Sequence, residues 1–145
     1  MQRVADVMTR GVEVISPQAT LQAAAQLMDD LNVGALPVCE NRRLVGMITD
    51  RDITVRATAT GLSPNETPVS EVMTEHTRWC KEHQTTDEVL QQMSDVQIRR
   101  LPVLNDQDEL VGIVSLGDLA TKEPEGVQEL LRDISSPSEP DRPQP

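Results

Sequence analysis

Two short stretches of the sequence place a hydroxyl group three residues before a carboxylate. Thr49 precedes Asp52 and Ser115 precedes Asp118, in each case at the end of an apolar run that contains a glycine. A hydroxyl and free backbone N–H groups at the start of a helix suit an anion, and a carboxylate there can accept both hydroxyls of a ribose diol. The recurrence favours a ribose and phosphate site, but the same spacing is typical of a capping box that only begins a helix.

The residues before the two Leu-Pro-Val tripeptides differ in charge. Gly34-Ala35 precede the first tripeptide and Arg99-Arg100 precede the second. Two guanidinium groups can bind a phosphate bidentately, but they can equally balance the acidic second half, where residues 66–145 carry 17 acids and 7 bases. If one site binds a phosphate, we expect it to combine Asp118 with this arginine pair.

Other candidates for chemistry are weaker. His76, Cys80 and His83 have a spacing that metal sites use, but an extended strand at 78–80 would point these side chains to different faces, so we expect no metal site. Cys39 and Cys80 are far apart, and reduced thiols are expected. The sequence has no Ser/His/Asp grouping and no glycine-rich phosphate loop, which predicts no catalytic residues and a protein that is not an enzyme.

The positions of these residues follow from an internal repeat. A shift of 65 residues lays Leu36-Pro37-Val38 on Leu101-Pro102-Val103, and a shift of 66 then lays Asp52 on Asp118. An ordered series of matches with one insertion in a turn indicates two copies of a unit of about 60 residues. Such a unit buries too little surface to be comfortably stable alone, which predicts that the two copies pack together, sheet to sheet.

Each copy is predicted to have the order β-α-β-β-α, which is an α/β (α+β) fold. The first strand is expected at 12–15 and 78–80. Helical spacing of apolar residues follows, after the N-cap candidates Thr20 and Thr85. A hairpin comes next, and a second helix then runs from about Asp50 to Thr60 and ends at Gly61. The expected hairpin strands are 36–39 with 44–49 and 101–104 with 110–115.

The predicted domain boundaries follow the repeat. Residues 1–61 form the first copy, 62–68 a linker, and 69–122 the second copy. A helical segment is expected at 123–134. The Ser-, Pro- and Asp-containing stretch 135–145 is expected to be a disordered tail.

Composition excludes several classes of partner. Trp79 is the only aromatic residue of the 145, and one ring cannot stack successive bases. The net charge of −11 opposes binding to nucleic acid or to an anionic membrane. No apolar run approaches the roughly 18 residues that span a bilayer, and no secretory segment follows Met1. We therefore expect a cytoplasmic protein.

The tandem unit, the Leu-Pro-Val tripeptides and the Gly-x-h-h-[Thr/Ser]-x-x-Asp-h runs (h, an apolar residue) resemble paired cystathionine β-synthase (CBS) domains, also called a Bateman module. The resemblance covers residues 1–122. It implies an adenosine-containing ligand (AMP, ADP, ATP or, in some members, S-adenosylmethionine) in a cleft between two sheets. Asp52 and Asp118 would hold ribose, and Thr49 and Ser115 would lie near ribose or phosphate.

The resemblance further implies that adenine contacts the strand backbone at Ile15 and Cys80 and the small residues Gly34 and Ala35. It also implies a homodimer formed through the second helices, with Ile53, Val55, Ala57 and Leu119 on the apolar face, and a client protein that the sequence does not identify. Two other functions stay open: a nucleotide-free dimeric scaffold, and a zinc or redox-responsive protein.

Overall fold

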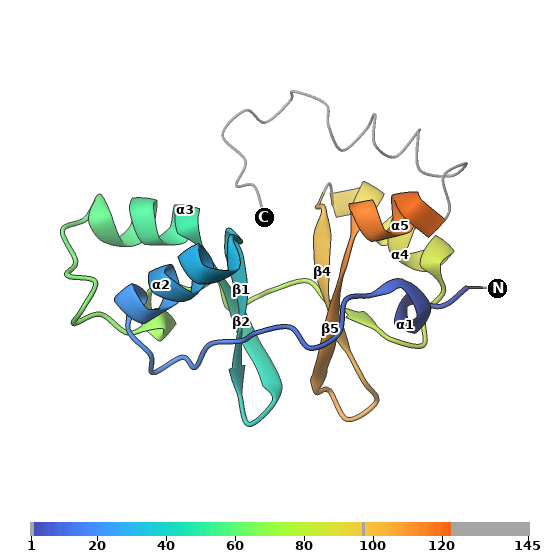
Figure 1. Cartoon of the computed structure of the whole chain (residues 1–145), viewed down its shortest axis with the longest axis horizontal. Coiled ribbons are helices and arrows are strands. Elements are labelled where there is room, and N and C mark those ends of the chain that lie inside the picture. The colour runs from blue at the N-terminus through green and yellow to red at the C-terminus, as the bar shows by residue number, and fades with distance from the viewer. Residues whose placement is uncertain (1, 97, 123–145) are drawn as a thin grey trace. The chain divides into compact units, whose positions relative to one another are not determined.

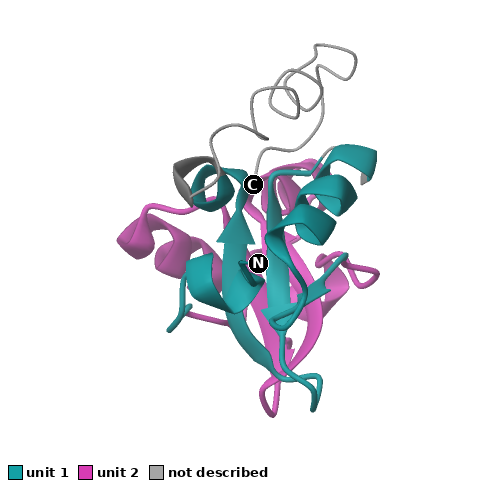
Figure 2. Ribbon diagram, turned by 90° about the vertical axis from the view of Figure 1, so that its right-hand side faces the viewer, with its two compact units in different colours: residues 1–12, 78–142 teal, residues 13–77, 143–145 magenta. Residues whose placement is uncertain are grey.

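The computed structural model describes residues 2–96 and 98–122 (Figure 1). The predicted helical segment 123–134 and the predicted tail 135–145 lie outside the described residues. The described residues fall into two compact units, which Figure 2 colours separately. Unit 2 is residues 13–77, and the described part of unit 1 is residues 2–12 together with 78–122.

Unit 2 is built on one antiparallel hairpin. Ala35 pairs with Thr49 and Leu36 with Ile48. The connecting residues Asn41 and Arg42 have φ of 54° and 70°, which is the left-handed geometry that a tight hairpin turn requires. Helix α2 buries Leu21, Ala24 and Met28 in the unit's core. The elements of this unit are α2 (Leu21–Leu31), β1 (Ala35–Glu40), β2 (Arg43–Thr49), α3 (Asp50–Asp52), the π-helical η1 (Ile53–Thr58) and the 3-10 helix η2 (Val69–Glu71).

Unit 1 repeats the hairpin and adds one strand. Strand β3 pairs in parallel with β4, and β4 pairs antiparallel with β5. Arg100 lies opposite Ser115, as Ala35 lies opposite Thr49 in the other unit. The elements are α1 (Val4–Val7), β3 (Cys80–Lys81), α4 (Thr86–Val96), β4 (Arg100–Leu104), β5 (Leu110–Ser115) and α5 (Leu116–Lys122).

The predicted helix starts are confirmed. Thr20 Oγ1 accepts a hydrogen bond from the Ala23 N–H at 3.1 Å. Thr85 and Glu88 form a reciprocal capping box, with the Thr85 N–H donating to Glu88 at 3.1 Å and the Glu88 N–H donating to Thr85 at 3.2 Å. The Thr85 N–H also holds the pKa of the Glu88 carboxyl below its ordinary value. Gly61 has φ +83° and follows η1 as the predicted stop.

The first strand of each copy differs from the prediction. The strand expected at 12–15 is wrong: Ile15 alone pairs, in an isolated parallel bridge with Val38, and Pro17, which has no N–H to donate, follows closely. The strand expected at 78–80 begins at Cys80 instead and covers two residues. In the first copy one residue pairs with the hairpin strand, and in the second copy two residues do.

The two sequence copies and the two compact units do not coincide. Residues 2–12 pack in unit 1, where Val4, Val7 and Met8 join the core of the second copy. Val69 and Val72, which the repeat aligns with Val4 and Val7, join the core of unit 2. The two copies have therefore exchanged their N-terminal segments.

Each exchanged segment ends against the middle of a hairpin strand. The Thr9 N–H donates to the Ile113 carbonyl at 2.8 Å, and the Thr74 N–H donates to the Met47 carbonyl at the same distance. The approach needs a residue without a side chain: a Cβ on Gly112 would lie 2.6 Å from the Thr9 carbonyl oxygen. A Cβ on Gly46 would likewise lie 2.6 Å from that of Thr74.

The predicted linker is part of unit 2. The Leu21 N–H donates to the Thr67 carbonyl and the Gln22 N–H to the Pro64 carbonyl, both at 3.0 Å. Thr67 is 5% exposed. Residues 62–68 thus bind the first turn of α2.

The buried clusters of both units consist of aliphatic and sulfur-containing side chains. Trp79 is 45% exposed and contributes to neither cluster. Among the described residues, no helix has the length and apolar character to cross a membrane.

Candidate functional site

The hairpin of unit 2 brings four of the predicted site residues to one end of the strands. Ala35 and Thr49 are paired across the hairpin. The Asp50 N–H donates to the Gly34 carbonyl at 3.0 Å, which fixes the start of α3 beside Gly34. Asp52 stands in the first turn of that helix. Gly34, Ala35, Thr49 and Asp52 form what we call the first-copy cluster.

The hairpin of unit 1 repeats this arrangement. Arg100 pairs with Ser115, and the Leu116 N–H donates to the Arg99 carbonyl at 2.8 Å. Asp118 stands in the first turn of α5. Arg99, Arg100, Ser115 and Asp118 form the second-copy cluster.

In both clusters the hydroxyl and the carboxylate cap a helix. Asp52 Oδ2 accepts from the Thr49 N–H and Thr49 Oγ1 accepts from the Asp52 N–H, both at 3.0 Å. The corresponding distances for Ser115 and Asp118 are 2.9 and 3.0 Å. The capping interpretation of the sequence pattern is therefore confirmed. Only Oδ2 of each carboxylate takes part in the cap, so Oδ1 can interact with another group.

The two clusters differ in what that further oxygen meets. Asp52 Oδ1 lies 3.7 Å from Arg56 Nε. Arg56 also donates to the Val72 carbonyl at 3.4 Å. Among the described side chains, the structure gives Asp118 Oδ1 no such cation.

The clusters also carry opposite charge. In the first copy, the Asp50 carboxylate lies over Gly34, where a Cβ would be 3.1 Å from Asp50 Oδ2. In the second copy, Arg99 takes the place of Gly34 and the buried Leu116 takes the place of Asp50. Arg99 and Arg100 are both exposed. The first-copy cluster therefore has a carboxylate beside it where the second copy has an apolar side chain, and the second-copy cluster carries two exposed arginines.

Ile15 and Cys80 are placed differently from the other predicted site residues. The two residues are 7% and 0% exposed, backbone included, so their side chains are closed to a ligand and Cys80 has no exposed backbone either. The Ile15 N–H already donates to the Pro37 carbonyl at 3.0 Å. Ile15 lies beside Val38, three residues along β1 from Ala35, and Cys80 lies beside Val103.

Comparison with known proteins identifies the repeated unit. The family model of the CBS domain matches residues 4–57 and 69–125, which are the two copies. The chain belongs to the CBS domain family. The resemblance inferred from the sequence is thereby confirmed, as is the α+β fold class.

Two relatives match this chain over most of their own length. The CBS domain-containing protein YhcV of Bacillus subtilis is 49% identical over 123 residues, which are 85% of this chain and 86% of the relative. Hypoxic response protein 1 of Mycobacterium tuberculosis is 37% identical over 139 residues, 94% of this chain and 96% of the relative.

Two solved structures share the fold. Hypoxic Response Protein I with two coordinated zinc ions has a TM-score of 0.75 and 38% identity, covering 83% of this chain and 98% of that one. CBSX2 of Arabidopsis thaliana in complex with AMP has a TM-score of 0.72 over 86% of this chain and 98% of that one. At 22% identity, CBSX2 shows the fold alone.

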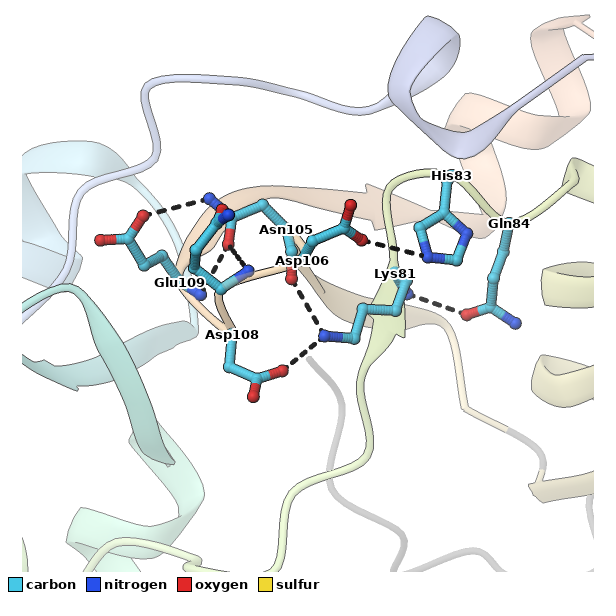
Figure 3. A network of polar contacts seen from close by, with 8 residues as sticks. Lys81, His83, Gln84, Asn105, Asp106, Asp108 and Glu109 are labelled. Atoms are coloured by element: carbon cyan, nitrogen blue, oxygen red, sulfur yellow. Dashed lines mark hydrogen bonds and ion pairs between the residues drawn. The ribbon is translucent and has the colours of Figure 1, made fainter.

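A polar network fixes strand β3 of the second CBS repeat (Figure 3). Lys81 Nζ donates to the Asn105 carbonyl at 3.0 Å and to the Asp108 carboxylate, and it lies 5.5 Å from the centre of the Trp79 ring. The Lys81 N–H donates to Gln84 Oε1 at 2.8 Å. The network thus ties the backbone around Cys80 to the β4–β5 turn. The sequence carries no local signal for it, because its two sides lie more than 20 residues apart.

The turn at the far side of this network is shaped by Asn105. Its Oδ1 accepts from the Gln107 and Glu109 N–H groups, both at 2.9 Å. His83 Nε2 lies 3.4 Å from Asp106 Oδ1, and both side chains are more than half exposed. This pair therefore contributes little to the stability of the turn.

Cys39 and Cys80 are free thiols buried in different units. Burial raises the pKa of Cys39 to about 11 and that of Cys80 to about 12, so both stay protonated at neutral pH. Within residues 2–96 and 98–122, no three His, Cys, Asp or Glu side chains are grouped as a metal site requires. His76 belongs to unit 2, whereas Cys80 and His83 belong to unit 1.

Proposed function

We propose that the chain is a non-catalytic regulatory module that binds an adenosine-containing ligand of the AMP, ADP or ATP class at its second CBS repeat. The observation that supports this most is the second-copy cluster, where two exposed arginines lie beside the Ser115–Asp118 pair. The AMP complex of CBSX2 shows that a protein with this fold holds such a ligand.

The chemistry of the second-copy cluster fits the polar parts of a nucleotide. Asp118 has one oxygen in the cap, and its other oxygen can accept the hydroxyls of ribose. Arg99 and Arg100 supply the positive charge that a phosphate needs in a chain of net charge −11. Adenine would contact aliphatic side chains and the backbone near Cys80, which the Lys81 network holds in place.

The first-copy cluster is a poorer phosphate site. Gly34 and Ala35 offer no cation, Asp50 lies over Gly34, and Asp52 already has Arg56 as a neighbour. We therefore propose one nucleotide per chain. Ile15, Gly34, Ala35, Thr49 and Asp52 remain the residues that a second, weaker site would use.

Regulation would follow from different affinities of the ligand for two states of the module. We propose that the module is a homodimer formed through its helices and acts on a client protein in the cytoplasm, where Cys39 and Cys80 remain reduced. The predicted apolar face needs correction, because Ala57 and Leu119 are 1% and 0% exposed and belong to the cores. Leu31 on α2 and Val55 on η1 are large apolar residues that are exposed, at 41% and 46%.

The experiment compares Asp118→Ala with Asp52→Ala by calorimetric titration of AMP, ADP, ATP and S-adenosylmethionine. Both variants remove the same kind of cap, so each should lose a similar stability, about 0.5–2 kcal/mol. We expect Asp118→Ala to abolish nucleotide binding and Asp52→Ala to retain it. Trp79 fluorescence provides a second readout. Equal affinities in the two variants, or no heat with any of the four ligands, would exclude the proposal.

A second candidate function is a nucleotide-free dimeric scaffold. The observation that favours it is that capping alone accounts for both hydroxyl–carboxylate pairs. Under this alternative, Asp118→Ala changes stability only, and a protein purified without nucleotide is already a dimer with its full client affinity.

A third candidate is a zinc or redox-responsive protein, favoured by the two zinc ions of the Hypoxic Response Protein I structure. The side chains it would use are Cys39, His76, Cys80 and His83. Elemental analysis of protein purified without chelator tests this candidate. Stoichiometric zinc that is lost in Cys39→Ala would support it. A dimer that contains no metal would exclude a zinc protein.

A further inference from the structure

The first exchanged segment, residues 2–9, is bound to unit 1 at both of its ends. The Val4 N–H donates to the Gln84 carbonyl at 2.9 Å, and Val4 is fully buried. Thr9 and Ile113 donate to each other's carbonyls, at 2.8 and 3.0 Å. The partners of the segment thus lie in the later part of the chain, and none of these contacts requires the segment to come from the same molecule.

The connection that follows this segment makes few contacts. Within the described part of the chain, residues 11–14 take part in no hydrogen bond or ion pair. Gly11, Glu13 and Val14 are exposed. Gly11 has φ +67°, and a Cβ placed on it would have no atom within 4 Å. A change of backbone conformation at Gly11 therefore breaks no hydrogen bond of either unit.

The second exchanged segment, residues 69–74, is not connected in this way. Residues 62–68, which precede it, bind the first turn of α2. The Val69 N–H also donates to the Ala19 carbonyl at 2.8 Å. Unit 2 thus holds its segment together with the chain leading into it, whereas unit 1 holds residues 2–9 next to an unbound connection.

We propose that unit 1 binds the first exchanged segment of a partner chain of the same sequence, so that two chains form a dimer by swapping residues 2–9. The swapped segment would make the same hydrogen bonds and bury the same side chains, Val4, Val7 and Met8. The two forms differ in the conformation of residues 11–14 and in the loss of freedom on association. Swapping of an identical element is a low-cost route to a dimer for this reason.

The swap depends on protein concentration. A chain's own segment has the advantage of a tether, which for a short flexible connection corresponds to an effective concentration in the millimolar range. Segments of other chains compete with it as the protein concentration approaches that range. After one segment has swapped, the second swap takes place within the pair and has the advantage of a tether as well.

The swapped dimer is independent of the nucleotide proposal and of the proposed contact through the helices. A dimer held by its helices alone leaves each segment in its own chain. A covalent link between the segment and unit 1 therefore distinguishes the two dimers, because it records which chain supplied the segment.

The experiment places a disulfide between the segment and β5. Directly opposite residues of an antiparallel pair have Cα atoms about 4.5–5.5 Å apart, which a disulfide can span. Thr9→Cys with Ile113→Cys makes this link in unit 1, and the control Met47→Cys with Thr74→Cys makes it in unit 2. Each variant is refolded at several concentrations, oxidised, diluted and run on a non-reducing denaturing gel.

We expect a disulfide-linked dimer with the first cysteine pair and linked monomers with the control pair. The dimer fraction should rise at least tenfold between about 10 µM and about 1 mM protein, because swapping includes a bimolecular step. Adding Gly11→Ala to the first pair should increase the ratio of dimer to monomer about fivefold or more, since the left-handed φ of the closed form disfavours alanine. Gly61→Ala, at φ +83° with equally open surroundings, is the matched control and should leave the ratio unchanged.

Linked monomers alone at every concentration would overturn the proposal. Equal amounts of linked dimer in the control pair, or in the unmodified chain with its buried Cys39 and Cys80, would overturn it as well, because oxidation would then be unrelated to the segment. If the first pair fails to fold, Arg3→Cys with Thr85→Cys provides a second link between the segment and unit 1, to which the same outcomes apply.

Discussion

At the scale of single residues, Gly112 and Gly46 are the described glycines with the least room for a side chain. A Cβ on Gly112 would lie 2.6 Å from a carbonyl oxygen of the exchanged segment and 2.9 Å from Met8 Sδ. We expect Gly112→Ala to destabilise unit 1 by about 1–3 kcal/mol, as other overpacked positions do. Urea unfolding followed by Trp79 fluorescence measures this.

Gly117→Ala is the matched control for Gly112→Ala. Among the described residues, its Cβ would meet only Ser115 Oγ, at an ordinary 3.6 Å, and alanine has a higher helix propensity than glycine. We expect unchanged or slightly increased stability. A destabilisation as large as that of Gly112→Ala would contradict the steric explanation.

The buried thiols predict a dependence of stability on alkaline pH. Burial raises the pKa of Cys39 from 9.0 to about 11 and that of Cys80 from 9.0 to about 12. The unfolded chain loses these protons first, so the stabilisation is complete below pH 9 and declines as pH rises through about 9 to 12. Urea midpoints measured from pH 8 to 11 should fall, and the double variant Cys39→Ala, Cys80→Ala should show a smaller slope. An unchanged slope would show that other groups are responsible.

The sequence predicted which residues form each cluster, because the hydroxyl–carboxylate spacing and the hairpin register are local properties. It did not predict the contrast between Asp50 over Gly34 and Leu116 beside Arg99. Those contacts depend on where a side chain lies after the hairpin has closed. Lys81 was missed for the same reason, since its acceptors Asn105 and Asp108 come from a distant turn.

At the scale of elements, Thr20 is the residue that starts α2. Its Oγ1 accepts from the Ala23 N–H at 3.1 Å. We expect Thr20→Ala to lower the free energy of unfolding by about 1 kcal/mol, the usual effect of losing a cap. Chemical denaturation with circular dichroism at 222 nm measures it.

Thr58→Ala serves as the comparison for Thr20→Ala. Thr58 is exposed at the end of η1 and caps no helix, so the change should stay within about 0.5 kcal/mol. If the two variants lost the same stability, the contribution of Thr20 could not be assigned to its cap.

Helices and hairpins were predicted well because their periodicity lies within one stretch of chain. The strand expected at 12–15 was wrong because pairing of that segment depends on how far it runs beside β1, and only Ile15 does so. The π-helical geometry of Ile53–Thr58 also has no counterpart in the apolar pattern.

At the scale of the whole molecule, the exchanged segments make unit 1 dependent on the chain's first residues. Deleting residues 1–12 removes Val4, Val7 and Met8 from the core of unit 1 and leaves residues 13–77 complete. We expect hydrogen exchange to show that β4 and β5 lose protection in this deletion variant while β1 and β2 keep theirs. Equal loss of protection in both hairpins would show that the two units unfold together.

Self-comparison of the sequence could not predict the exchange. Residues 4–9 and 69–74 align well with each other, so each fits either hairpin equally by pattern. Which hairpin each one joins is decided by the path of the chain between them.

The exchange also affects the order in which the protein can fold during its synthesis. Residues 13–77 are contiguous, so unit 2 can form as soon as Thr77 has left the ribosome. Residues 2–12 are made before unit 2, yet their hydrogen-bonding partners are made much later, among them Gln84, the partner of Val4, and Ile113, the partner of Thr9. At a translation rate of about 5–20 residues per second, the apolar side chains of Val4, Val7 and Met8 stay unburied for several seconds or more before the rest of their core is made. Residues 2–12 are thus translated before unit 2 but buried after it.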